Sequence, residues 1–531
     1  MHNNLTKFFV NDKIYYLLIF CFTLLVSFYY FPTLDQKGVT AALVNSSEIY
    51  NNNHNQLIFF RLDYTNSWSL IIQVIRLLIY AGLSLEFINF LILFISLNMS
   101  VYGIFLISKR ISNDLFFSFC ISCFLVISNI NFGNLDYPVI LINSHTAGMI
   151  SQACILLIFG LIADRKLNLA ILLSILTVGL HLVVGLWILS ILLISIYFFK
   201  KEILDINNLT KINLILYILT AIIVTFSFIE FRLNAINIPI LYDKYLYQTY
   251  IDIWDHHRSK IFGINYKYIS LTFLMLCSIL FYYRKEKKVK TNSFFFKTVT
   301  LQVLISFIIY ILWKIFPNLF QGIFLKIIPS RFFLNHSVFG MAIITSIFYF
   351  YTKPLLKNKT IIIVILTLLV MHPILYIDKY INKFERIYKN IKLVKRNYDH
   401  NFWEKIKEID IADGLILTSI HTCDKTIQKS KKPILICMES FDGMAYNPKL
   451  VIVAKNIIEK IYEIDFFNPP EKNRGGISSD NIYKKTFQER SLKDWEKISK
   501  EFNIKGLILP VEWNLRLNKS IIGKKFTYYK L

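Results

Sequence analysis

Long apolar stretches separated by short basic segments run through residues 1–377. A helix of about 20 apolar residues crosses the ~30 Å hydrocarbon layer of a bilayer. Eleven stretches approach that length, at 14–31, 86–107, 115–130, 146–163, 168–180, 183–199, 212–229, 268–283, 294–313, 332–352 and 360–377. The pattern therefore predicts an α-helical polytopic membrane domain with about eleven transmembrane helices over 1–377.

The fifth and sixth spans come from one apolar run, 168–199, which a single straight helix would extend to about 48 Å. Gly179, His181 and Gly185 lie near the middle of this run. We therefore expect two short helices that meet near one membrane face. One long tilted helix is the alternative.

The distribution of basic residues predicts the orientation. The N-terminal tail and every second segment between spans together hold 17 Lys and Arg, whereas the alternate loops, 32–67, 131–145, 230–267 and 314–331, hold 10 in a greater length. By the positive-inside rule the N-terminus is cytoplasmic, and an odd number of spans leaves the C-terminal part outside. The expected location is a bacterial cytoplasmic (inner) membrane.

Residues 378–531 have a different composition, with 30 of the 59 basic and 20 of the 35 acidic side chains. Short apolar runs at 415–418, 434–437, 507–509 and 526–529 alternate with amphipathic stretches at 402–408, 450–462 and 492–502. This order predicts a small exported α/β domain. It contains no glycine-rich phosphate loop, which argues against catalysis in this domain. Cys423 and Cys437 could form a disulfide outside the cell.

The net charge of +24 would suggest a nucleic-acid partner in a soluble protein. Here 55% of the residues are hydrophobic, and the basic residues form short clusters between apolar runs. We therefore expect membrane lipids as partners and no nucleic acid.

Carboxylates in the first outer loop, 32–85, are the first candidates for chemistry. Asp35 closely follows the first span, and Glu48 and Asp63 come later in the loop. Burial at the hydrocarbon boundary raises the pKa of a carboxyl group and suits it to act as a general base. We predict Asp35 and Asp63 as catalytic and Glu48 as substrate-binding; solvated loop residues are the alternative. Residues 68–80 predict an amphipathic helix along the membrane surface.

Cationic side chains elsewhere on the outer side are candidates for binding a phosphate. His256, His257 and Arg258 follow Asp255 in the loop between the seventh and eighth spans, and Arg331 opens the tenth span. Two imidazoles beside a guanidinium could hold a phosphate, and a divalent cation is the second interpretation. Anchoring of the loop to headgroups is the alternative. His181, at the helix break, is a further candidate for substrate binding.

The arrangement resembles the GT-C class of membrane glycosyltransferases. It shares a cytoplasmic N-terminus, a first outer loop with acidic residues and a surface helix, about eleven spans and an exported C-terminal domain. Asp35 matches the position of the acidic motif of the class, although Gln36 stands where a second acidic residue is often found. The resemblance implies sugar transfer from a polyprenyl-phosphate-linked donor to an envelope acceptor on the outer face.

Other classes of protein would use the same outer cations. A lipid or polysaccharide transporter or flippase would place ionisable residues deep in several spans, and few are found there. A polysaccharide polymerase and a non-catalytic membrane scaffold are further alternatives. The sequence names neither donor nor acceptor, and it leaves the need for a metal unknown.

Overall fold

The structure is a computed structural model. It describes residues 12–31, 37–45, 49, 69–128, 141–142, 147–203, 211–233, 241–255, 266–285, 293–316, 336–354, 400–420, 422–437, 444, 448–471 and 480–531. Two compact units emerge, one made of Met1–Leu34, Asn89–Phe228 and Phe262–Asn390, the other of Asp35–Ile88, Ile229–Ile261 and Ile391–Leu531.

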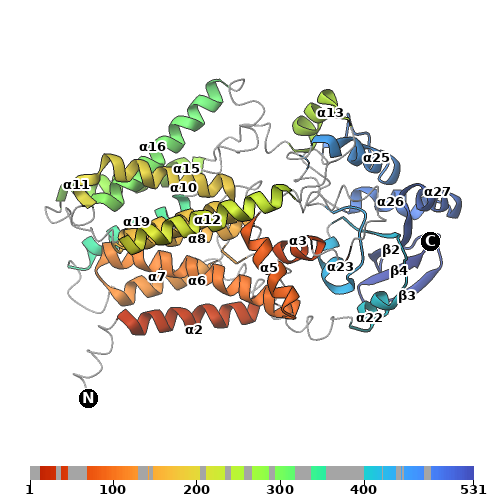
Figure 1. Cartoon of the computed structure of the whole chain (residues 1–531), viewed down its shortest axis with the longest axis horizontal. Coiled ribbons are helices and arrows are strands. Elements are labelled where there is room, and N and C mark those ends of the chain that lie inside the picture. The colour runs from red at the N-terminus through yellow and green to blue at the C-terminus, as the bar shows by residue number, and fades with distance from the viewer. Residues whose placement is uncertain are drawn as a thin grey trace, which may run out of the picture. The chain divides into compact units, whose positions relative to one another are not determined.

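Helices make up the described part of the first unit (Figure 1). They are α2 (Asp12–Tyr30), most of α6 (Leu85–Ser112), α7 (Leu115–Ile127), α8 (Ala147–Ala163), α9 (Leu167–Leu180), α10 (Leu182–Phe198), α11 (Lys200–Ile203), most of α12 (Lys211–Leu233), α15 (Tyr266–Lys285), α16 (Ser293–Ile315) and α19 (His336–Thr352). Three of the described helices, α2, α6 and α16, are long and apolar enough to cross a membrane. Shorter apolar helices lie at seven more predicted spans, and the eleventh, 360–377, falls outside the described residues.

The apolar run at 168–199 forms two helices, as predicted, and not one. α9 ends at Leu180 and α10 begins at Leu182, with His181 as the single residue between them. The two helices pack closely because Gly185 has no side chain: a Cβ there would lie 2.2 Å from the backbone nitrogen of Val178. The glycine at this position thus permits the tight helical hairpin.

Ion pairs in the first unit join helix ends that the basic clusters assign to one side of the membrane. The pairs are Lys109 with Asp12 at 2.7 Å and with Asp164 at 3.3 Å, Lys353 with Asp114 at 2.7 Å, and Lys297 with Glu202. Each of these ion pairs joins helices that are more than 50 residues apart in sequence. Each of these ion pairs thus joins helix ends that the positive-inside rule places on the same side.

The second unit combines two segments from between the helices of the first unit with the C-terminal part of the chain. Its first two segments form α3 (Lys37–Asn45), α5 (Leu70–Tyr80), α13 (Lys244–Thr249) and the π-helix η3 (Tyr250–Trp254). The C-terminal part forms α22 (His400–Glu408), β1 (Leu415–Thr418), α23 (Cys423–Ser430), η6 (Pro448–Leu450), α25 (Val451–Ile461), α26 (Asn481–Glu489), α27 (Leu492–Phe502), β2 (Ile504–Pro510), β3 (Lys519–Ile522) and β4 (Phe526–Lys530).

The four strands form one mixed sheet in the order β1-β2-β4-β3. β1 and β2 are parallel, with Leu417 opposite Leu507, and β4 is antiparallel to both β2 and β3. Ile434 adds an isolated parallel bridge on the free side of β1. The predicted strands at 415–418, 507–509 and 526–529 are present, whereas the run at 434–437 contributes only this bridge.

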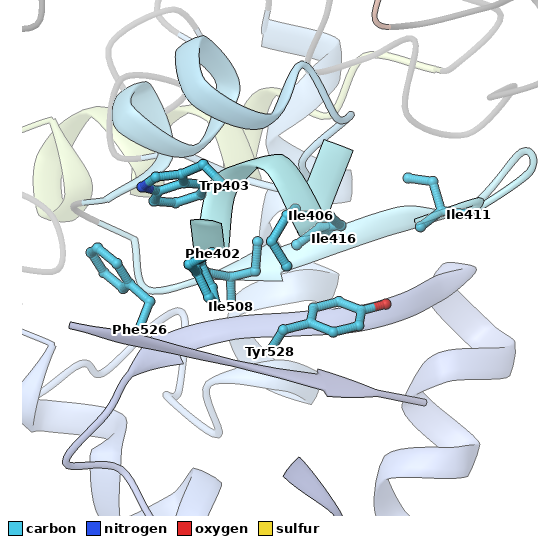
Figure 2. Close-up of a cluster of buried hydrophobic side chains, with 8 residues drawn as sticks. All are labelled: Phe402, Trp403, Ile406, Ile411, Ile416, Ile508, Phe526 and Tyr528. Carbon is cyan, nitrogen blue, oxygen red and sulfur yellow. The ribbon is translucent and has the colours of Figure 1, made fainter. Parts of the chain in front are cut away.

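One face of the sheet is covered by α22 (Figure 2). The buried side chains of this cluster are Phe402, Trp403, Ile406, Ile411, Ile416, Ile508, Phe526 and Tyr528. Phe402 and Ile406 are four residues apart and so share one face of α22. Phe526 and Tyr528 are two residues apart on β4 and so point to the same face of the sheet. The apolar face of α22 and the apolar face of the sheet therefore pack together in a single hydrophobic layer.

Replacement by alanine should have different effects on stability at Gly185, in the α9–α10 hairpin, and at Gly340, in α19. We expect Gly185→Ala to destabilise the protein by about 1–3 kcal/mol, because the added methyl group collides with backbone atoms. At Gly340 a Cβ would meet mainly the flexible side chain of Met275, with its sulfur at 3.2 Å, so Gly340→Ala should be neutral or slightly stabilising. Thermal unfolding in detergent measures both, and equal stability of the two variants would contradict this packing.

Candidate functional site

Most of the side chains predicted for the site lie outside the described residues. These are Asp35, Glu48, Asp63, His256, His257, Arg258 and Arg331. Two described elements lie next to them in sequence: α3 begins two residues after Asp35, and η3 ends two residues before His256. The contacts of α3 and η3 therefore show what the structure places next to the predicted site residues in sequence.

His181 is described, and one of its hydrogen bonds is local. The side chain caps α10, with Nδ1 accepting a hydrogen bond from the backbone N–H of Val184 at 3.4 Å. The side chain is half-buried. The structure thus gives His181 a role in the α9–α10 turn, and its predicted role in substrate binding stays a prediction.

α3 is held by the C-terminal domain through α23. The two helices pack together, and the buried Gln428 donates a hydrogen bond from Nε2 to Oγ1 of the buried Thr40, at 3.1 Å. Next to it, Lys429 pairs with Glu86 at 2.8 Å. A buried amide that lost its partner would cost free energy, so this hydrogen bond ties the position of α3 to that of α23.

A disulfide anchors α23 in its own domain. Cys423, the first residue of α23, is bonded to Cys437, with their Cα atoms 5.7 Å apart. The pairing that the sequence left as a possibility is therefore present. The bond ties the start of α23 to the segment that follows the Ile434 bridge beside β1.

η3 is held by the same domain at a second place. Trp254 is buried, and its indole N–H donates to the backbone oxygen of Phe466 at 2.8 Å. The two rings stack with their centroids 5.4 Å apart. The preceding residues add a second aromatic contact, between Tyr245 and Phe467. π-Helices are rare and often occur at functional sites, and this one leads directly into the predicted phosphate clamp.

Local hydrogen bonds shape both sides of this contact. Asp465 accepts from the backbone N–H groups of Phe467 and Asn468, which lowers the pKa of its carboxyl group and holds the turn that presents Phe466. On the other side, the buried Asp255 accepts from the hydroxyl of Tyr250 at 3.2 Å. The end of η3 is thus fixed immediately before residues 256–258.

The carboxyl ends of the parallel strands are where doubly wound α/β domains bind ligands. After β1, the backbone N–H of Ile420 donates to the hydroxyl of Tyr483 at 2.9 Å, and that hydroxyl donates to Asp480. Burial is the main cause that raises the pKa of Tyr483, so it stays a neutral donor. A protein side chain thus occupies this edge of the sheet.

Thr40, Gln428, Trp254 and Phe466 were not predicted as a group from the sequence. Each belongs to an ordinary amphipathic or aromatic pattern, and Thr40 and Gln428 are 388 residues apart. Nothing in either local pattern indicates the partner. Among the described residues no group of three or more His, Cys, Asp or Glu is arranged to hold a metal ion.

Comparison of the chain with models of protein families and with curated proteins gives no match.

The hydrogen bond between Trp254 and Phe466 leads to a prediction about the opening of residues 244–255. We expect Trp254→Phe to keep the ring contact but leave the buried carbonyl oxygen of Phe466 without its donor, a loss of about 1–3 kcal/mol. Hydrogen exchange of peptides covering 244–255 should accelerate by about five- to a hundredfold. Tyr245→Phe removes only an exposed hydroxyl from the same segment and should leave exchange unchanged. Unchanged exchange in Trp254→Phe would show that this hydrogen bond does not hold η3.

Proposed function

We propose that the chain is a multi-pass membrane glycosyltransferase of the GT-C type. In this proposal the N-terminus is cytoplasmic and the C-terminal domain lies outside a bacterial inner membrane. The enzyme transfers a sugar from a polyprenyl-phosphate-linked donor to an acceptor of the cell envelope.

One observation carries the proposal: the C-terminal domain holds both segments that border the predicted site. α3 follows Asp35 and packs on α23, while η3 precedes His256 and contacts Phe466. A general base and a phosphate clamp must lie near one reacting centre, since proton removal and departure of the leaving group belong to one displacement. Anchoring both segments on one domain is what such a composite site requires.

The chemistry assigned to these residues is a displacement at the anomeric carbon. The acceptor hydroxyl loses its proton to Asp35 or Asp63 and its oxygen bonds to the anomeric carbon. The bond from that carbon to the phosphate oxygen breaks, and the charge that develops on the phosphate is stabilised by the cationic side chains of 256–258 and Arg331. The spans bind the prenyl tail of the donor.

The positions of the described ion pairs support a transferase over a transporter. In the first unit the ion pairs of the described residues lie near helix ends, as at Asp12, Asp114 and Glu202. A transporter would need ionisable groups at the binding site near the midplane. The disulfide between Cys423 and Cys437 supports the outer location of the C-terminal domain, because such bonds persist outside the cytosol.

The role of Asp35 is tested by rescue of a deletion strain. If Asp35 is the base, Asp35→Asn should lower sugar transfer by about a hundredfold or more, because the amide cannot accept the proton. Mass spectrometry of polyprenyl-linked sugars should show accumulation of the donor and loss of the envelope glycan. The matched control is Asp252→Asn, an exposed aspartate of the second outer segment that accepts from Gln248.

Full rescue by Asp35→Asn would remove this residue from the mechanism. No change in glycans or in carrier-linked sugars on deletion would contradict the transferase itself. Immunoblotting of each variant shows whether it reaches the membrane at the wild-type level.

The proposed orientation predicts the redox state of the two cysteines in living cells. We expect Cys423 and Cys437 to resist a thiol-alkylating reagent until a reductant is added, because the exported domain keeps them oxidised. Peptide mapping by mass spectrometry reads both positions in the native chain. Alkylation of both thiols without reductant would place the domain in the cytosol and refute the orientation.

A further inference from the structure

The last hairpin of the C-terminal domain carries charge of one sign. Residues 514–531 hold five basic side chains and no acidic one. All five are exposed: Arg516, Lys519, Lys524, Lys525 and Lys530. Elsewhere in the domain the signs are mixed, since α27 has three basic and three acidic residues and Lys455 of α25 pairs with Glu459 at 3.2 Å. The hairpin is therefore a concentrated source of positive potential.

The sheet holds these cations in two groups along one edge. In the order β1-β2-β4-β3, the strand β3 lies at the edge and pairs with β4. Lys519 is opposite Tyr529 at the open end of the hairpin, and Lys530 follows; we call Lys519 and Lys530 the open-end group. Lys524 and Lys525, the turn group, form the turn at the other end. With a rise of ~3.3 Å per strand residue, the two groups are about 15 Å apart.

The backbone that carries both groups is fixed before any ligand binds. The turn is closed by a hydrogen bond from the backbone N–H of Gly523 to the oxygen of Phe526 at 2.8 Å. Phe526 and Tyr529 of β4 are buried, and the hydroxyl of Tyr529 donates to the backbone oxygen of Trp513 at 2.6 Å. A ligand that meets cations on a fixed backbone loses less free energy to ordering on binding.

The chemistry of the surface selects the class of partner. Within 514–531 the one large apolar side chain that is exposed is Ile522, at 64%. Protein interfaces are built on an apolar core, and surfaces that bind a membrane insert several apolar side chains. Asn514, Asn518 and Ser520 are exposed as well and can hydrogen-bond to hydroxyl groups. Two cationic groups at a distance, with amides and a hydroxyl, fit a hydroxyl-rich polymer that carries repeated negative charges.

We propose that the hairpin of β3 and β4 binds an anionic polysaccharide. Acidic groups of one polymer chain pair with the open-end group and with the turn group, and its hydroxyl groups bind the polar side chains of the same segment. This contact goes beyond sugar transfer, because it requires neither the predicted catalytic residues nor the phosphate clamp. It lies entirely within the C-terminal domain.

Binding of labelled polygalacturonate to the full chain in a non-ionic detergent tests the contact. Lys524→Gln combined with Lys525→Gln should weaken binding by about tenfold at low salt, because two exposed ion pairs are lost. The matched control combines Lys493→Gln with Lys497→Gln, which removes the same charge from the exposed, mixed-sign surface of α27. The control should bind within about twofold of the wild type.

Fluorescence anisotropy of the labelled polymer measures the affinity, and thermal unfolding shows that each variant is folded. Equal losses in the two double variants would show that net charge alone matters and would overturn the proposal. A dextran phosphate tested in parallel distinguishes phosphate from carboxylate as the preferred group. Failure of both polymers to bind the wild type would also overturn the proposal, whether or not the protein transfers sugars.

The length and the class of the polymer give independent readouts. Digalacturonate is too short to reach both groups and should bind at least about tenfold more weakly than a long oligogalacturonate, which engages both at once. Equal affinity of the two would refute the contact with two groups. Polyglutamate presents the same carboxylates on a peptide backbone without hydroxyl groups. If it binds more tightly than polygalacturonate, the hairpin is a surface for an acidic protein and the proposal is wrong.

Discussion

The packing of α23 against α3 is the contact on which the arrangement of the second unit depends. It joins two helices whose hydrogen-bonded residues, Thr40 and Gln428, are both buried. A buried amide or hydroxyl without its partner costs about 1–3 kcal/mol, so neither helix can leave the other without penalty. The disulfide at Cys423 then ties this pair to the sheet region. Residues 35–88 and the C-terminal part of the chain therefore belong to one compact unit, although several helices separate them in sequence.

The first unit follows a different constraint, the one expected of apolar helices that can cross a membrane: charge is costly in hydrocarbon. Its described ion pairs join the ends of helices, and Lys109 links two of those ends by contacting both Asp12 and Asp164. Where helices must come close in their interiors, small residues permit it, as Gly185 does between α9 and α10. The charged groups of these ion pairs thus lie at helix ends, while the middle parts of α9 and α10 pack closely.

The C-terminal domain is built on one mixed four-stranded sheet, and it contacts two segments from earlier in the chain. Tyr483 lies at the carboxyl end of β1, and residues that follow the sheet's first strand hold α3 and η3. Phe466 holds η3 from the loop after α25, while Gln428 holds α3 from α23. The domain thus contacts η3 and α3 at two separate places.

The sequence by itself determined the local elements. The strand at 415–418, the helix at 492–502 and the break at His181 follow from short-range periodicity and from glycine placement, which act over a few residues. The alternation of Lys and Arg likewise grouped the helix ends that the ion pairs of the first unit join, because the basic residues of each short loop can be counted from the sequence alone. What only the tertiary structure decided is which distant segments meet. The pairing of Thr40 with Gln428 and of Trp254 with Phe466 depends on the path of the whole chain, and no local pattern encodes a partner hundreds of residues away.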